Sequence, residues 1–284
     1  MRARDLRRDK VGPTGVRTCP LRAPRRVAVT AVVILAAGVG SRLGDNFADR
    51  PKGLLQIGDR PIIEQSIRNL AQANVRDILI VTGHRAGHFE NLECDAGVSL
   101  RTLHNPRYAE CGSMYSLYCA RHALDDAFLL LESDLIYEPR ALTELLAHPA
   151  DDAILLSSPT GAGDEVWVAT KEGRLEAMSK DMAALGGKNA VAGELVGISK
   201  ISSPLFQIML RKARRAFTDS LHYDYETDCL VAAAKERPIE CALIADLVWA
   251  EIDDPKHLRR AREIVYPELQ RRATAAGERP PKIL

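Results

Sequence analysis

The sequence contains no long apolar run, and no segment of its 284 residues approaches the roughly 18 consecutive apolar residues of a membrane-spanning helix. Its six cysteines form no C-x-x-C pair, and its seven histidines form no H-x-x-H or H-E-x-x-H cluster, which argues against a zinc site. The net charge of +1 argues against a dedicated nucleic-acid binder. No apolar signal segment is evident, so we expect reduced thiols, a cytoplasmic location and no association with membranes.

The charge that is present lies unevenly along the chain. Residues 1–28 carry nine Arg or Lys and two acids, a net charge of +7, so the remainder is acidic at −6. This stretch has no apolar periodicity, and we interpret it as a disordered basic extension or as an overlong gene start. Hydrophobic residues make up 46% and charged residues 27%, which is typical of a soluble globular protein. We expect one domain over residues 29–268 and a frayed tail over residues 269–284.

Strand-like and helix-like patterns alternate along the first half of the chain. Strands are predicted at 27–36, 77–82, 99–103, 127–131 and 153–157, with helices at 61–73, 112–124 (Ser113 as its N-cap) and 140–147. The second half predicts paired strands at 165–170 and 174–178, strands at 195–201 and 242–251, and helices at 204–215, 225–235 and 255–265. This order predicts a three-layer α/β fold with a mixed, mostly parallel sheet, whose ligand lies at the carboxyl ends of the strands.

The sharpest motif follows the first predicted strand. It consists of LAAGVGSRL with a downstream PKGLL, and it supplies Leu35, Ala36, Ala37, Gly38, Gly40, Ser41, Arg42 and Lys52. Small residues let the backbone approach a ligand, its exposed N–H groups favour anions, and two cations add to this, which together suit a triphosphate. The pattern is neither a P-loop nor a dinucleotide fingerprint. The alternative is an ordinary glycine-rich turn with two solvated bases.

These residues resemble the signature of sugar-phosphate nucleotidyltransferases, a resemblance that runs from about residue 30 to about residue 265. Later segments resemble the cytidylyltransferases, above all those acting on 2-aminoethylphosphonate and then those acting on phosphocholine. They are NPRY at 105–108, GSMYSL at 112–117, LESDLIYE at 131–138, YDYETD at 223–228 and EID at 251–253. The resemblance implies a nucleotide-diphospho-sugar-transferase-like fold and the transfer of a nucleotidyl group to a phosphate or phosphonate, with release of pyrophosphate.

Three acids are the candidate metal ligands. Asp134 follows a predicted strand, and Glu251 and Asp253 are two residues apart, so in a strand both would point to one face. Mg²⁺ prefers hard oxygen ligands such as carboxylates, and nucleotidyl transfer needs charge compensation at the phosphates. We therefore expect Mg²⁺ at these residues. The alternatives are a turn-capping role for Asp134 and a solvated edge for the other two.

The acceptor segment is predicted at residues 223–228. An aminoalkylphosphonate is positive at one end, and its ammonium would bind acids and aromatic faces, which this segment offers at Tyr223, Asp224, Tyr225, Glu226 and Asp228. The same acids also suit a helix N-terminus with Asp224 as its cap. For the phosphonate end, Lys180 after a predicted strand is the candidate, and an ordinary surface lysine is its alternative.

The sequence therefore favours a cytidylyltransferase that converts CTP and 2-aminoethylphosphonate to CMP-2-aminoethylphosphonate and pyrophosphate, with catalytic roles for Arg42 and Lys52. The alternatives within the class are phosphocholine or another phosphonate or inositol phosphate as acceptor. Only five Phe, seven Tyr and two Trp are available to build an aromatic cage for choline. A catalytically silent nucleotide-binding regulatory subunit is the alternative from another class. The expected partners are CTP and a small acceptor, with no nucleic acid, and a homodimer is left open.

Overall fold

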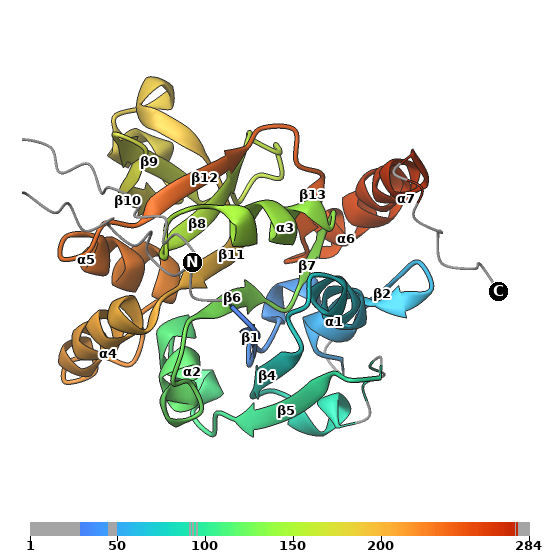
Figure 1. The fold of residues 1–284 in the computed structure, drawn as a ribbon, viewed down its shortest axis with the longest axis horizontal. Helices are drawn as coiled ribbons and strands as arrows, with labels where there is room; N and C mark the ends of the chain where they lie inside the picture. Colours follow the sequence, from blue (N-terminus) through green and yellow to red (C-terminus); the bar gives the residue numbers. More distant parts are fainter. Residues whose placement is uncertain are drawn as a thin grey trace, which may run out of the picture.

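The fold is a three-layer arrangement of helices around one mixed sheet (Figure 1). The computed structural model describes residues 29–44, 50–90, 92, 94, 96–275 and 277. The basic stretch predicted at 1–28 therefore lies outside the described residues, as does the end of the predicted tail. No helix of the described residues is both long enough and apolar enough to span a membrane.

The central sheet has nine strands in the order β5-β4-β1-β6-β11-β8-β12-β10-β9. Their bounds are Ala31–Ala36 (β1), Asp77–Thr82 (β4), Ser99–His104 (β5), Phe128–Glu132 (β6), Ala153–Ser157 (β8), Trp167–Lys171 (β9), Arg174–Ser179 (β10), Val191–Ile201 (β11) and Glu240–Ile244 (β12). All of them run in one direction except β10 and β11, which pair antiparallel with their neighbours. The predicted mixed, mostly parallel sheet is confirmed.

Helices cover both faces of this sheet because each has one apolar side. On one face lie α1 (Ile62–Gln72) and α3 (Arg140–Ala147), whose buried residues share a core with β1, β4 and β6. On the other lie α2 (Ser113–Cys119), α4 (Ser203–Ala216) and the π-helical turn η9 (Tyr225–Leu230), which continues into α5 (Val231–Ala234). The five cysteines of the described residues are all free.

A smaller third core brings distant segments to one end of the sheet. It joins the two-stranded sheets β2 (Gln56–Ile57) with β3 (Arg60–Pro61) and β7 (Leu135–Tyr137) with β13 (Trp249–Glu251) to α6 (Pro255–Arg260) and the π-helical turn η10 (Ala261–Val265). Leu43, the last residue of the glycine motif, and Ile252, between two of the candidate metal ligands, are both buried in it. This packing fixes the glycine loop and the acidic motif beside each other.

Several predicted elements need correction. The single strand expected at 242–251 is two strands, β12 and β13, in different sheets, because the chain turns between residues 244 and 249. Ser113 is the first residue of α2 rather than its N-cap, which is Gly112. The helix expected to end at 265 continues through α7 (Tyr266–Ala275), where Arg272 pairs with the buried Glu138, so residues 269–275 are not a frayed tail.

Candidate active site

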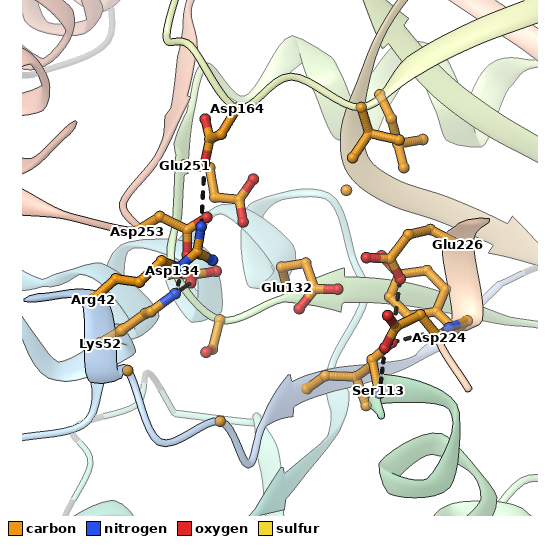
Figure 2. A pocket seen from close by; sticks show the side chains of 18 of the residues that line it. Arg42, Lys52, Ser113, Glu132, Asp134, Asp164, Asp224, Glu226, Glu251 and Asp253 are labelled. Carbon is orange, nitrogen blue, oxygen red and sulfur yellow. Dashed lines mark hydrogen bonds and ion pairs between the residues drawn. The ribbon is translucent and has the colours of Figure 1, made fainter. Parts of the chain in front are cut away.

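A cavity of about 300 Å³ lies where the carboxyl ends of β1 and β6 meet β11 and β13. Figure 2 shows its charged side chains in two groups, one around Lys52 and Asp253 and one around Ser113 and Glu226, with Glu132 between them. The sequence motifs at the glycine loop, the acidic strand ends and the 223–228 segment all contribute to its wall. This is the strand edge at which the sequence places the ligand.

The glycine loop forms the wall beside β1. Leu35, Ala36, Ala37, Gly38, Gly40, Arg42 and Lys52 all line the cavity; of Ser41 only the backbone is described. Gly40 has a positive φ of 68°, and a Cβ atom there would lie 3.2 Å from the Lys52 side chain. Glycine at this position therefore permits both the left-handed turn and the close approach of Lys52.

Two cations and two carboxylates form a network of ion pairs at this wall. The Lys52 ammonium donates to Asp134 at 3.1 Å and also to Asp253, and the Arg42 guanidinium lies 2.8 Å from Asp253. Burial alone would lower the pKa of Lys52, but the two carboxylates outweigh it and raise that pKa above its ordinary value. Burial would raise the pKa of Asp253, but Lys52 reverses this and brings it to about 2. Lys52 and Asp253 are therefore both charged at neutral pH.

Three carboxylates of the predicted metal site converge. One oxygen from each of Asp134, Glu251 and Asp253 lies within 4.8 Å of the other two, and Asp134 and Asp253 are only 7% and 2% exposed. Burial raises the pKa of Glu251 well above its ordinary value, and its neighbours Asp134 and Asp253 add to this. Three clustered, mostly buried carboxylate oxygens match the donors that Mg²⁺ prefers, so these residues fit the expected ion.

The 223–228 segment is held against the start of α2. The Asp224 carboxylate accepts from the Ser113 backbone N–H at 3.0 Å and from its hydroxyl at 3.2 Å, so this acid caps α2 across the fold. Asp228 is exposed and accepts from the Asp224 backbone N–H, and neither Asp228 nor Tyr223 lines the cavity. The expectation that all five side chains face the acceptor is therefore wrong for Tyr223 and Asp228.

Four predicted acceptor residues do lie in the cavity wall. Asp224, Tyr225 and Glu226 line it from η9 and the residue before it, and Lys180 lines it from the end of β10. Burial raises the pKa of Glu226 to about 7; Asp224 adds to this rise and Lys180 opposes it. Lys180 is thus close enough to Glu226 to interact with it electrostatically.

The sequence did not assign two acids that the structure places here. Glu132 ends β6 and its burial raises its pKa well above the ordinary value, with Glu226 and Asp134 adding to the effect. It stands two residues before Asp134, and residues with this i, i+2 spacing point to the same face of a strand. This spacing was the sequence signal that could have identified Glu132. Asp164 lies 3.8 Å from Arg42 and belongs to a loop that carries no motif, so nothing in the sequence pointed to it.

The loop that carries Asp164 is fastened to β11 by a buried acid. Glu194 is 3% exposed and accepts from the Thr160 backbone N–H at 2.6 Å and from its hydroxyl at 3.1 Å. Burial raises the pKa of Glu194 to about 7, although the Thr160 hydrogen bonds oppose this rise. In the folded protein this carboxyl therefore takes up a proton at a higher pH than it does in the unfolded chain.

We expect the stability that Glu194 contributes to fall as pH rises. A folded pKa above the unfolded one means that the contribution is complete below about pH 4.5 and is lost as pH rises through about 7. Between pH 5.5 and 8 this loss should amount to about 1–2 kcal/mol. Urea unfolding of the wild type and Glu194→Gln at both pH values measures it, because the variant should lose that part of the pH dependence. The exposed Glu176→Gln is the control, and an unchanged pH dependence in Glu194→Gln would contradict the expectation.

Comparison with known proteins gives the family. Residues 32–273 match the family model of the MobA-like NTP transferase domain. The chain belongs to this family. It is 33% identical over 84% of its length to a CMP-5'-(3-aminopropyl)phosphonate synthase of Streptomyces rubellomurinus, of which it spans only 39%. It is 26% identical over 77% of its length to a 2-aminoethylphosphonate cytidylyltransferase of Lancefieldella rimae, of which it spans 88%.

A solved structure shares the fold. The inositol-1-phosphate CTP transferase of T. maritima superposes with a TM-score of 0.73 at 18% identity, covering 87% of this chain and 98% of that one. The resemblance to nucleotidyltransferases and the nucleotide-diphospho-sugar-transferase-like fold are therefore confirmed.

Proposed function

We propose that this protein transfers CMP from CTP to a small aminoalkylphosphonate, with 2-aminoethylphosphonate as the first candidate, and releases pyrophosphate. One observation carries the proposal: a single cavity joins the glycine-loop cations, the carboxylate triad (Asp134, Glu251 and Asp253) and a further group of acids around Glu132 and Glu226 (Figure 2). The first two suit a metal-bound triphosphate, and the third suits an acceptor with a positive end. The aminoalkylphosphonates named for two relatives are acceptors of this kind.

The residues support an in-line displacement without a covalent intermediate. A phosphonate oxygen is already anionic, so it needs positioning rather than a base to attack the α-phosphorus. Lys52 and Arg42 would offset the negative charge that builds on the departing pyrophosphate. Lys180, on the wall near the acids, would hold the phosphonate. The proposed Mg²⁺, held by Asp134, Glu251 and Asp253, would supply further charge compensation at the phosphates. The cytoplasmic location and the homodimer stay predictions.

A substrate panel tests the proposal. Pyrophosphate release is measured with CTP, UTP, ATP and GTP, each against 2-aminoethylphosphonate, 3-aminopropylphosphonate, phosphocholine, inositol 1-phosphate and glucose 1-phosphate, with Mg²⁺ and with EDTA. The expected result is turnover with CTP and an aminoalkylphosphonate that EDTA abolishes. Preference for phosphocholine, for a sugar phosphate or for another nucleotide would replace the substrate assignment. No turnover with any pair would favour the silent regulatory subunit.

A further inference from the structure

Glu132 and Glu226 are half-buried acids of the cavity, and within the described residues neither of them forms an ion pair. Lys180 interacts with Glu226 only at longer range. Asp134 and Asp253 pair with Lys52, and Asp164 lies beside Arg42. Across the described part of the chain, by contrast, no Lys, Arg or His nitrogen lies within 4.0 Å of the carboxylate of Glu132 or Glu226. Buried carboxylates normally have a cationic partner, because leaving them unpaired is costly. The missing partner is therefore to be sought in a ligand.

The two acids are held in place by neutral donors. The Tyr225 hydroxyl donates to Glu132. The Ser113 hydroxyl lies 3.3 Å from Glu226 and shares its single proton between Glu226 and Asp224. Glu132 also fits closely against β11, where Gly197 has a φ of 78° at an irregularity in the strand pairing. A Cβ atom on Gly197 would lie 3.2 Å from the Glu132 side chain. These contacts orient both carboxylates without neutralising them.

We propose that Glu132 and Glu226 together receive the primary ammonium of the acceptor, and that this pair selects an amine over a hydroxyl and over a trimethylammonium group. This inference rests on the proposed function. A primary ammonium has three N–H donors and can bond to both carboxylates at once, whereas a hydroxyl offers one donor and a trimethylammonium group offers none. Glu132 lies between the triad and Glu226 of η9, so the pair is placed to hold the far end of an acceptor (Figure 2).

The rest of the wall does not suit choline. Of the described residues that line the cavity, only Tyr108, Tyr225 and Trp249 are aromatic. Tyr225 is 1% exposed and Trp249 is 4% exposed, and each is committed to a hydrogen bond, to Glu132 and Ser157 respectively. They cannot present the several ring faces that a quaternary ammonium prefers.

The test compares kcat/KM for 2-aminoethylphosphonate, 2-hydroxyethylphosphonate and phosphocholine, with CTP and Mg²⁺, in the wild type, Glu132→Gln and Glu226→Gln. The wild type should prefer the amine over both other acceptors. Each variant should lose about 10- to 100-fold with the amine, as expected for lost charged hydrogen bonds, and little with the hydroxyl compound. The KM for CTP should change less than about twofold. Glu176→Gln, an exposed acid on β10, is the matched control.

Tyr225→Phe is a milder second variant in case Glu132→Gln does not fold. It removes only the hydroxyl that orients Glu132. It should cause a smaller loss that is again confined to the amine. If the wild type uses no amine, the proposed function fails and the inference fails with it. If the wild type uses the amine while both Gln variants keep its amine-to-hydroxyl ratio, the inference alone is overturned. Circular dichroism and CTP binding show whether each variant is folded.

Discussion

Lys52→Ala is expected to lower turnover at saturating substrate by about 10²- to 10³-fold, which is the usual effect of removing one electrostatic contact from a transition state. Lys52 is the cation that the glycine loop brings closest to two carboxylates, and its side chain is only 16% exposed. A stopped assay of pyrophosphate release measures the effect. The exposed Lys171→Ala, at the end of β9, serves as the matched control and should leave turnover unchanged.

Loss of Lys52 also leaves Asp134 and Asp253 without their shared counter-ion, so the variant is expected to be less stable as well as slower. Lys52→Arg separates the two effects, because it keeps the charge but presents a larger, planar group. It should recover most of the stability and only part of the turnover. Near-normal turnover in a folded Lys52→Ala protein would remove Lys52 from the catalytic set.

The sequence predicted most of the fold because the buried strands carry unambiguous apolar patterns. β4 and β8 were predicted with the same bounds as in the structure, and α1 differs by one residue at each end. Errors arose where local sequence does not decide the outcome. The helix after residue 265 is polar, and it is stabilised by the bridge from Arg272 to the buried Glu138, a partner 134 residues away. The break between β12 and β13 follows from pairing with two different strands, β8 and β7.

The candidate site likewise has one part that could be predicted from the sequence and one part that could not. The glycine motif and the triad were predictable, because both lie at strand ends where spacing alone determines the direction of the side chains. The acceptor segment was not, because Asp224 is occupied by Ser113 at the N-terminus of α2, and no local pattern reports a contact between residues 111 positions apart. Glu132 was overlooked for a related reason: only the structure shows that none of the described residues forms an ion pair with it, whereas the nearby Asp134 pairs with Lys52.

The cavity therefore contains two kinds of carboxylate. Asp134 and Asp253 both pair with the internal cation Lys52, which lowers the pKa of Asp253 to about 2. Among the described residues, none forms an ion pair with Glu132, Glu226 or Glu251, and burial raises the pKa of each of these three acids. We expect cationic ligands to stabilise the protein more at pH 8 than at pH 6, because deprotonating these groups costs free energy that a bound cation offsets.

Asp253→Asn and Asp134→Asn are each expected to abolish Mg²⁺-dependent turnover, while the affinity for CTP without metal changes little. The amide keeps the shape of the side chain but removes the charge that binds a hard cation. Asp253 should have the larger effect, because it also pairs with both Lys52 and Arg42. Calorimetric titration with Mg²⁺ provides a measurement independent of turnover, and both variants should bind the ion at least about tenfold more weakly.

Asp254→Asn is the matched control for this pair of variants. Asp254 neighbours Asp253, but its carboxylate accepts from the His257 backbone N–H as the N-cap of α6, a role that asparagine fills equally well. This control should keep wild-type turnover and Mg²⁺ affinity, because it changes one charge in the same segment without touching the triad. If Asp134→Asn or Asp253→Asn matched the control in both measurements, that residue would not be a metal ligand, and the cluster with Lys52 would have a structural role instead.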